Sequence, residues 1–171
     1  VVILFKASET NFVSETFETT AIVLRVVPYE ERHRVVTALT ETHGKISALA
    51  RNSIQSRRFG GCLEPFTAST WRIAERPGAD LFRVEEATIR RSFEGLRKNF
   101  EALSLASVFN ELMLRLAPER ESAVDLFKLH SNALAALEEL SDAELTTRST
   151  FALLNSYLGK LLQWNGTQPR L

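Results

Sequence analysis

Residues 66–90 read FTASTWRIAERPGADLFRVEEATIR, and this stretch decides the fold of the first half of the chain. Its first segment alternates between two faces, with Trp71 and Ile73 on the same one, which is the period of a half-buried strand. The sequence PGAD at residues 77–80 is a turn, because proline and glycine supply the backbone angles that a reversal needs. Residues 81–90 follow as a second strand, so the stretch predicts a β-hairpin.

The residues before this hairpin predict further strands. Residues 21–27 alternate with a period of two and are rich in β-branched side chains, which favours a strand. Residues 34–39 and 45–51 are two more candidates, and Gly44 between them provides the positive φ of a tight turn. Four or five short strands within about 75 residues are too few for a sandwich and suit a small barrel.

The second half of the chain changes to a helical period. Apolar residues recur at steps of three and four, so each series forms one face of a helix. The three series are Phe93, Leu96, Phe100, Leu103, Ala106, Phe109, Met113 and Leu116; then Val124, Phe127, Leu134 and Leu137; then Phe151, Leu154, Leu158 and Leu161. We expect these faces to be core, so that truncating Phe100 or Leu154 would destabilise the protein.

Helix boundaries can be predicted from capping residues. Pro118 ends the first helix. Ser122 with Asp125 and Ser141 with Glu144 have the spacing of capping boxes, which would open the second and third helices. The sequence therefore predicts a barrel followed by three or more packed helices.

Composition excludes several classes of protein. The 171 residues carry 21 basic and 21 acidic side chains, so the net charge of zero argues against coating nucleic acid by bulk electrostatics. The longest apolar run, Val1 to Phe5, is far shorter than a membrane span. Cys62 is the single cysteine, which is compatible with a reducing compartment, and we expect a cytoplasmic protein that contacts no membrane.

Catalytic and cofactor signatures are missing from the sequence. It has no phosphate-binding GxxxxGK[ST] or GxGxxG motif, and His33, His43 and His130 lack partners at metal-ligand spacing. The adjacent pair Glu85 and Glu86 is interpreted as solvated surface, because neighbouring strand residues point to opposite faces. We expect no enzyme activity, no metal and no cofactor in this chain.

One local basic segment stands out. No acidic residue occurs between Glu41 and Glu64, whereas Lys45, Arg51, Arg57 and Arg58 all fall there. Arginines in a polar loop after a strand can pair with phosphate and stack on bases. On the residues alone, this segment is either a nucleic-acid contact or an ordinary solvated loop.

Several blocks of this sequence are distinctive, namely TAIVLR at 20–25, YEERHRVV at 29–36, LTETHGKISALAR at 39–51 and SRRFGGCLEPFT at 56–67. These blocks resemble the RecO family of bacterial DNA-repair proteins, with LLQWNG at 161–166 and PRL at 169–171 as weaker matches. The similarity spans about residues 19–171. It is identified on the order, the spacing and the basic loop that runs into leucine, proline and phenylalanine.

The resemblance implies an α+β protein with an N-terminal OB-fold β-barrel followed by an all-helical domain. The expected organisation is an extension at 1–18, an OB-fold domain at 19–91 and a helical domain at 92–171, which stops before the zinc-binding segment that many family members carry. By match to the family's basic positions, the residues expected to contact nucleic acid are Arg34, Lys45, Arg51, Arg57 and Arg58.

The resemblance also implies a function and its partners. RecO proteins bind single- and double-stranded DNA, anneal complementary strands and assist RecA loading with RecR on strands coated by single-strand-binding protein. We expect the C-terminal tail of single-strand-binding protein to dock on the helical half, whose candidate basic rim is Arg97, Lys98, Arg115, Lys128, Arg148 and Lys160. The alternatives are a peptide-binding structural adaptor without DNA contact and an enzyme of unrecognised type.

Overall fold

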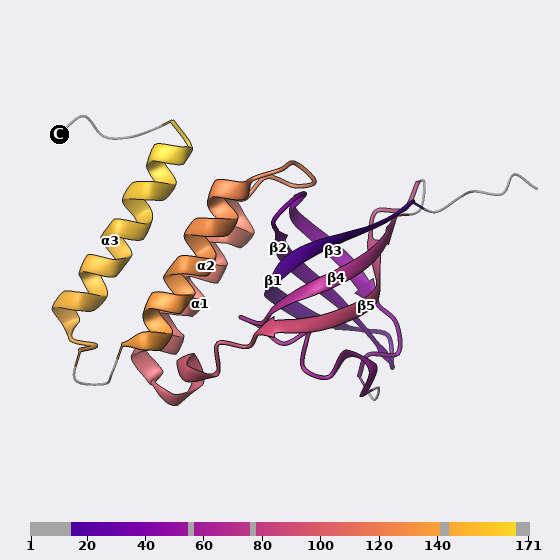
Figure 1. Ribbon diagram of the computed structural model, residues 1–171, viewed down its shortest axis with the longest axis horizontal. Helices are drawn as coiled ribbons and strands as arrows, with labels where there is room; N and C mark the ends of the chain where they lie inside the picture. The colour runs from indigo at the N-terminus through magenta and orange to yellow at the C-terminus, as the bar shows by residue number, and fades with distance from the viewer. Residues whose placement is uncertain (1–14, 55–56, 76–77, 141–143, 167–171) are drawn as a thin grey trace, which may run out of the picture.

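The computed structural model describes residues 15–54, 57–75, 78–140 and 144–166, which form five strands and three α-helices (Figure 1). The strands are β1 (Glu15–Tyr29), β2 (His33–Thr40), β3 (Gly44–Ala50), β4 (Ala68–Glu75) and β5 (Phe82–Arg91). The helices are α1 (Phe100–Leu116), α2 (Val124–Glu139) and α3 (Thr147–Trp164), with short 3-10 turns η1 (Arg57–Phe59) and η2 (Glu94–Lys98). This order confirms the predicted α+β class.

The strands close into a barrel in the order β1-β2-β3-β5-β4. Both predicted hairpins, β2 with β3 and β4 with β5, are present as antiparallel pairs. The barrel closes where β3 and β5 run parallel, with Ala48 opposite Phe82 and Leu49 opposite Arg83. A five-stranded barrel closed in this way has the OB-fold architecture, as predicted.

Strand β1 begins earlier than the expected boundary at residue 19. Glu15 pairs with Glu75 of β4, and the later part of β1 pairs with β2 as far as Tyr29. The long strand β1 thus pairs with β4 along its first part and with β2 along its later part. Residues 15–18 therefore belong to the barrel, and residues 1–14 of the expected extension lie outside the described residues.

Two hydrophobic clusters meet at β1 and β2. Inside the barrel, Trp71 and Ile73 of the deciding hairpin are fully buried. On the outer face of the barrel, Ile22 and Leu39 pack with the helices, together with Phe109 of α1. The middle of β1 is therefore buried on both faces, and the cluster on the outer face is shared by the barrel and the helices.

A short connection between α1 and α2 locks the two halves together. The backbone N–H of Lys45 donates to the carbonyl oxygen of Pro118 (2.8 Å), and that of Arg120 donates to the carbonyl oxygen of Lys45 (3.0 Å). Gly44 has the predicted positive φ, 59°, and a Cβ there would lie 2.1 Å from the carbonyl oxygen of Glu121. Only glycine allows this approach.

The first helix is shorter than predicted. Residues 94–98 form the 3-10 turn η2, and α1 begins at Phe100, where the side chain of Asn99 accepts a hydrogen bond from the N–H of Ala102. Phe100 is 79% exposed. The expectation that it is core is wrong, because the change of backbone before α1 breaks the helical phase that the spacing assumed.

The predicted capping boxes also differ from the observed ones. Helix α2 follows Ala123, and no side chain caps it, so the proposed cap at Ser122 is wrong. Ser141 lies outside the described residues. Helix α3 is instead opened by a capping box of Thr146 and Ser149, which satisfies backbone donors of its first turn.

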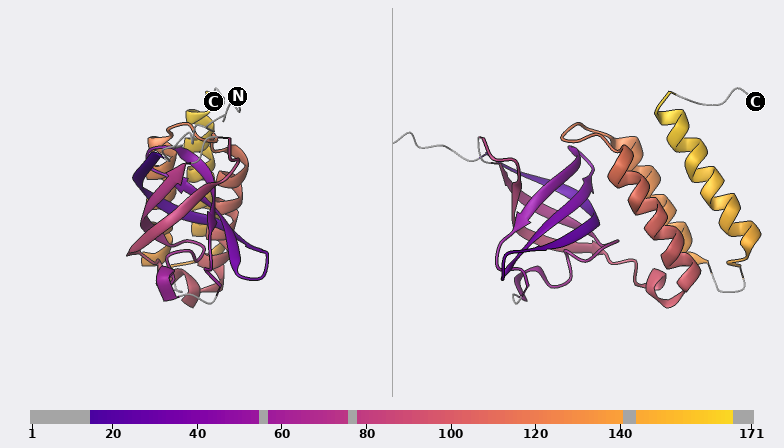
Figure 2. Two further views of the ribbon diagram at one scale, coloured as in Figure 1. Left: turned by 90° about the vertical axis from the view of Figure 1, so that its right-hand side faces the viewer. Right: turned by 180° about the vertical axis from the view of Figure 1, so that it is seen from behind.

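The helices lie in layers beside the barrel (Figure 2), with α3 outermost. Most of the predicted apolar stripe positions are buried or half-buried. The exceptions are Phe100, Leu116, Val124 and Phe151, which are exposed. None of the described helices combines the length and the apolar character of a membrane span.

Candidate nucleic-acid interface

A polar cleft opens at the end of the barrel where β3 ends. Its cavity of about 410 Å³ is lined by Arg51, Asn52, Arg58, Arg83, Val84 and Glu85, and we call it the basic cleft. Because β5 runs parallel to β3 from Phe82 onward, it continues past the end of β3 and forms one wall. The loop after β3 and the turn η1 form the other.

The loop after β3 is tied to the turn between β1 and β2. The N–H of Asn52 donates to Nδ1 of His33 (2.9 Å), and the N–H of Ile54 donates to the carbonyl oxygen of Arg32 (3.3 Å). Tyr29 at this turn is 46% exposed. The same end of the barrel therefore offers arginines for phosphates and an aromatic ring on which a base can stack.

Turn η1 holds Arg58 over β5. Phe59 is buried in the barrel cluster and anchors the turn, and the Arg58 guanidinium lies 5.6 Å from the centre of the Phe59 ring. Arg58 donates a hydrogen bond to the backbone carbonyl oxygen of Glu85. Its neighbour Arg57 is exposed to solvent.

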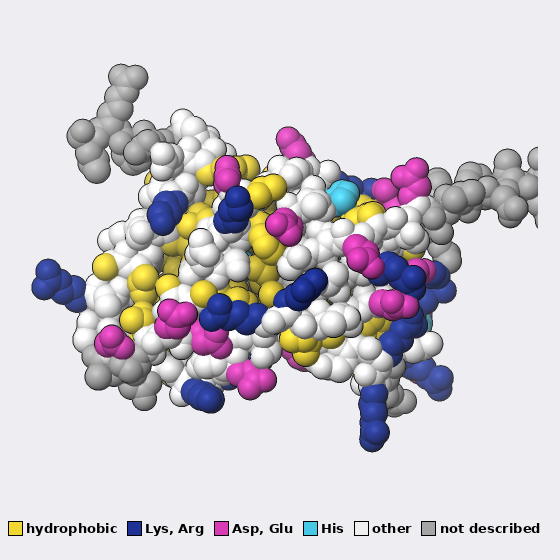
Figure 3. All heavy atoms as spheres, in the orientation of Figure 1, with side chains coloured by type: hydrophobic (Ala, Val, Ile, Leu, Met, Phe, Trp, Pro, Cys, Tyr) yellow, Lys and Arg dark blue, Asp and Glu magenta, His cyan; other side chains and the backbone are white. Residues whose placement is uncertain are grey.

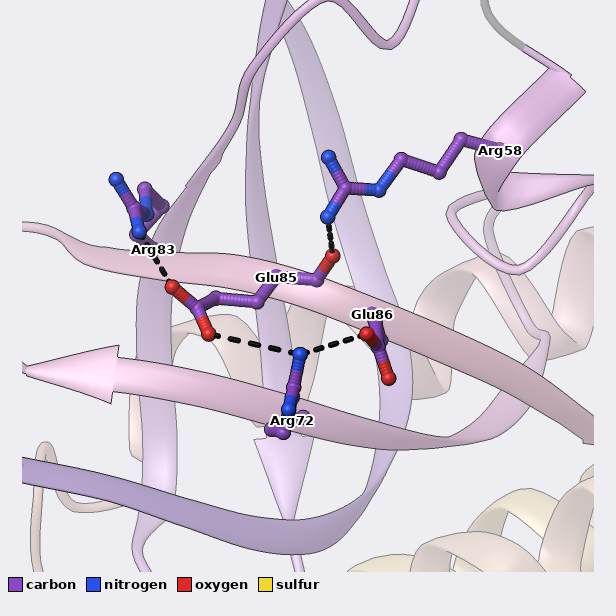
Figure 4. Close-up of polar contacts among 5 residues, drawn as sticks. All are labelled: Arg58, Arg72, Arg83, Glu85 and Glu86. Atoms are coloured by element: carbon purple, nitrogen blue, oxygen red, sulfur yellow. Dashed lines mark hydrogen bonds and ion pairs between the residues drawn. The ribbon is translucent and has the colours of Figure 1, made fainter.

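Glu85 and Glu86 do not diverge as expected for adjacent strand residues. The register of β4 with β5 shifts between Arg72, opposite Glu86, and Ile73, opposite Val84, so Glu85 lies on a β-bulge. A bulge lets two successive side chains emerge on one side. Both carboxylates consequently face Arg72, with Nη2 of Arg72 at 2.6 Å from Glu86 and 3.8 Å from Glu85 (Figure 4).

The structure brings together most of the basic residues predicted from the sequence. Arg51 and Arg58 line the basic cleft, and Arg57 adjoins Arg58 in η1. Arg34 lies at the same end of the barrel, since it pairs with Ala50 at the end of β3. Its guanidinium is bound to Glu64 at 3.1 Å.

Lys45 is not part of this group. It lies at the opposite end of β3, about 20 Å away by the rise of a strand. Its ammonium donates to the carbonyl oxygen of Leu114 (2.7 Å) and lies 3.4 Å from Glu119. These contacts give Lys45 a place at the junction of barrel and helices.

Sequence reasoning missed two arginines of the cleft region, Arg72 and Arg83. Their signal was present in the alternation of the hairpin, because Trp71 and Ile73 point into the barrel and place Arg72 outside. Arg83 likewise alternates with two buried neighbours on β5. Only the pairing of β4 with β5 and the contact of Arg58 with Glu85 show that they gather with Arg58.

The charge on this surface is mixed. Lys and Arg side chains gather on the barrel half, at the lower right of Figure 3, with Asp and Glu side chains between them. Arg34, Arg72 and Arg83 each have a carboxylate partner. The surface is therefore suited to local phosphate contacts rather than to a broad positive field.

A second cavity lies in the helical half. It has a volume of about 640 Å³, and apolar side chains such as Phe109, Leu153 and Trp164 line it. Of the candidate basic rim residues, Lys160 is the one found in the lining, and Asp125 lies there too. We call this cavity the helical pocket.

Cys62 and His130, two side chains of types that take part in catalysis, are buried. The described residues contain no group of three or more His, Cys, Asp and Glu side chains that could hold a metal ion. Cys62 is buried, and burial raises the pKa of its thiol, which disfavours the reactive thiolate. His130 is fully buried between helices.

Comparison with known protein families places both halves of the chain. Residues 14–93 match the family described as Recombination protein O N terminal, and residues 97–167 match Recombination protein O C terminal. The chain belongs to the RecO family. The RecO matches meet between residues 93 and 97, where the barrel gives way to η2.

Individual RecO relatives agree with this assignment. A protein of Anaeromyxobacter sp. (strain Fw109-5) named DNA repair protein RecO is 39% identical over 73% of this chain and 49% of its own length. A protein of the same name from Geobacter metallireducens is 35% identical over 73% of this chain and 51% of its own length. Another, from Caldanaerobacter subterraneus subsp. tengcongensis, is 28% identical over 90% of this chain and 60% of its own length. The chain thus spans between 49% and 60% of the length of these relatives.

Proposed function

We propose that this chain binds DNA in repair and recombination, through the basic cleft and without covalent chemistry. The single observation that carries the proposal is the gathering of Arg51, Arg58 and Arg83 in one cleft. The exposed Tyr29 ring at the same end of the barrel supports it, because OB-fold proteins combine phosphate contacts with base stacking.

The proposal extends to the finer role that the resemblance to RecO proteins implies. The chain acts on single- and double-stranded DNA, anneals complementary strands and assists RecA loading with RecR in the cytoplasm. The relatives named DNA repair protein RecO support the repair context. The helical pocket, which has apolar side chains and Lys160 in its lining, is the proposed receptor for the C-terminal tail of single-strand-binding protein.

Titration of a labelled single-stranded oligonucleotide at several salt concentrations tests the proposed DNA binding. Replacing Arg57 and Arg58 together by Ala should weaken binding about tenfold or more. The slope of log affinity against log salt should become shallower by about one to two units, because binding with fewer phosphate contacts releases fewer counterions. The melting temperature should change little, since both side chains are exposed.

Arg148→Ala is the matched control. Arg148 is also exposed, but it lies on α3, the helix farthest from the barrel (Figure 1). It should bind the oligonucleotide like the parent chain. If the parent shows no salt-dependent binding, the DNA-binding function is wrong and the peptide-binding adaptor becomes the better reading.

A further inference from the structure

Three arginines from three separate segments contact Glu85 in the basic cleft, two of them at its carboxylate and one at its backbone (Figure 4). Arg83 donates a hydrogen bond to Oε1 of Glu85, and Nη2 of Arg72 lies 3.8 Å from its Oε2. Arg58 donates to the backbone carbonyl oxygen of the same residue. Two negatively charged oxygens held between guanidinium groups are also what a phosphodiester presents.

The bulge places Glu85 in this position. In a regular strand Glu85 and Glu86 would alternate between faces, but the register shift aims both at Arg72. Glu85 is the more enclosed of the two, with its side chain 21% exposed against 63% for Glu86. Glu85 thus fills the centre of the cluster, whereas Glu86 lies at its edge.

The Glu85 carboxylate is held in its charged form. The hydrogen bond from Arg83 lowers its pKa, and the positive charges of Arg83, Arg72 and Arg58 lower it further, against the opposing effect of desolvation. All three arginines therefore act on the same negative charge. That charge cancels part of the field that would otherwise attract a nucleic acid.

Arg72 is incompletely satisfied in this arrangement. Its Nη2 reaches both carboxylates, but its Nε is buried and has no hydrogen-bond partner. A buried donor without a partner is unfavourable. At 3.8 Å, the contact between Nη2 of Arg72 and Glu85 is also longer than a hydrogen bond, so it is a weak contact that a better ligand can replace.

We propose that the space among Arg58, Arg72 and Arg83 is a phosphate subsite of the DNA interface, which Glu85 occupies as an internal counter-anion until a DNA phosphate displaces it. This inference rests on the proposed DNA binding and assigns that site a specific subsite and a competitor. Binding then exchanges one anion for another, so that the arginines stay paired in the free and the bound protein. An isolated phosphate gains little from the exchange, whereas a strand with several phosphates in register gains from its further contacts.

The test is the affinity of Glu85→Gln for a labelled single-stranded oligonucleotide across a salt series. Glutamine keeps the shape and removes the charge, so we expect about three- to tenfold tighter binding at low salt. The dependence of log affinity on log salt should steepen by about one unit, because arginine charge freed from Glu85 now neutralises phosphate. Glu85→Ala, which removes the carboxylate and its hydrogen bonds, should also bind more tightly than the parent.

Two controls separate the subsite from a general change of charge. Glu111→Gln changes the net charge equally, and it breaks an exposed pair with Arg115 on α1, so it should leave affinity almost unchanged. Arg83→Ala combined with Glu85→Gln should lose most of the gain. Melting curves of each variant establish that the barrel is folded.

Each outcome has a defined meaning. Equal gains in Glu85→Gln and Glu111→Gln would show a bulk charge effect and overturn the subsite. Weaker or unchanged binding by folded Glu85→Gln and Glu85→Ala would also overturn it, because Glu85 would then only organise the arginines. Absence of binding by the parent and by every variant at low salt would instead overturn the DNA-binding function, and the subsite with it.

Discussion

At the scale of single residues, a buried polar chain connects the barrel to all three helices. Tyr157 of α3 and Asn110 of α1 lie on either side of His130, each with an atom 3.0 Å from a ring nitrogen. The amide of Asn110 also donates to the carbonyl oxygen of Leu24 in β1 (2.9 Å). Because that amide nitrogen is a donor, its oxygen accepts from Nε2–H of His130, and Nδ1 accepts from the Tyr157 hydroxyl.

Because His130 is held neutral in the folded protein, we expect the protein to lose stability in acid. Burial lowers its pKa from 6.5 to about 3, so the unfolded chain takes up a proton more readily than the folded one. The free energy of unfolding therefore has its full value above about pH 6.5. It falls as the pH drops toward 3, by as much as about 4 kcal/mol. Urea unfolding at a series of pH values measures it.

The control for the acid effect is the difference between variants. His130→Gln removes the titrating group and should be less stable at neutral pH but less sensitive to acid between pH 6.5 and 4. His43→Gln, a change at a half-buried histidine, should keep the parent's acid sensitivity. Parallel pH profiles for the parent and His130→Gln would contradict the assignment to His130.

At the scale of elements, two phenylalanines of α1 have opposite environments. Phe109 is 1% exposed and stacks on Tyr157 with ring centres 4.0 Å apart, whereas Phe100 is 79% exposed. We expect Phe109→Ala to lower the free energy of unfolding by about 3–5 kcal/mol. Phe100→Ala should change it by no more than about 0.5 kcal/mol. Chemical denaturation of both variants compares them directly, and equal losses would contradict this packing.

The same elements show what the sequence could and could not predict. Alternation and turn residues were sufficient for both hairpins, because each depends on neighbours in sequence. The start of α1 was missed because Leu96, at a sequence spacing that also fits a helix, lies in the 3-10 turn before the cap at Asn99, and this turn shifts the phase of the residues after it. The convergence of Glu85 and Glu86 could not be foreseen either, since a bulge depends on the register with β4.

At the scale of the whole molecule, the basic cleft and the helical pocket belong to different halves. The proposed tail receptor combines apolar side chains with polar ones, and Lys160 is the basic residue of its lining among the described residues. Calorimetry with the full chain should show that a tail peptide binds and that loss of its terminal apolar residue abolishes binding. Lys160→Ala should lower the affinity for the peptide at least about threefold, because the terminal carboxylate of the peptide loses a charged partner.

Lys128→Ala is the matched control for this measurement. Lys128 is an exposed lysine of the neighbouring helix α2 and is not in the pocket lining. It should leave peptide affinity unchanged. Peptide affinity that is unchanged by both lysine substitutions and by loss of the terminal apolar residue would contradict the tail proposal.

The shared core of the two halves has a consequence for synthesis on the ribosome. Ile22 and Leu39 face outward from the barrel, and the residues that cover them come from helices made later. At about 5–20 residues per second, the barrel strands emerge several seconds before α2 is complete. During that interval the nascent barrel presents an uncovered apolar face, so this face is where a chaperone would engage the growing chain.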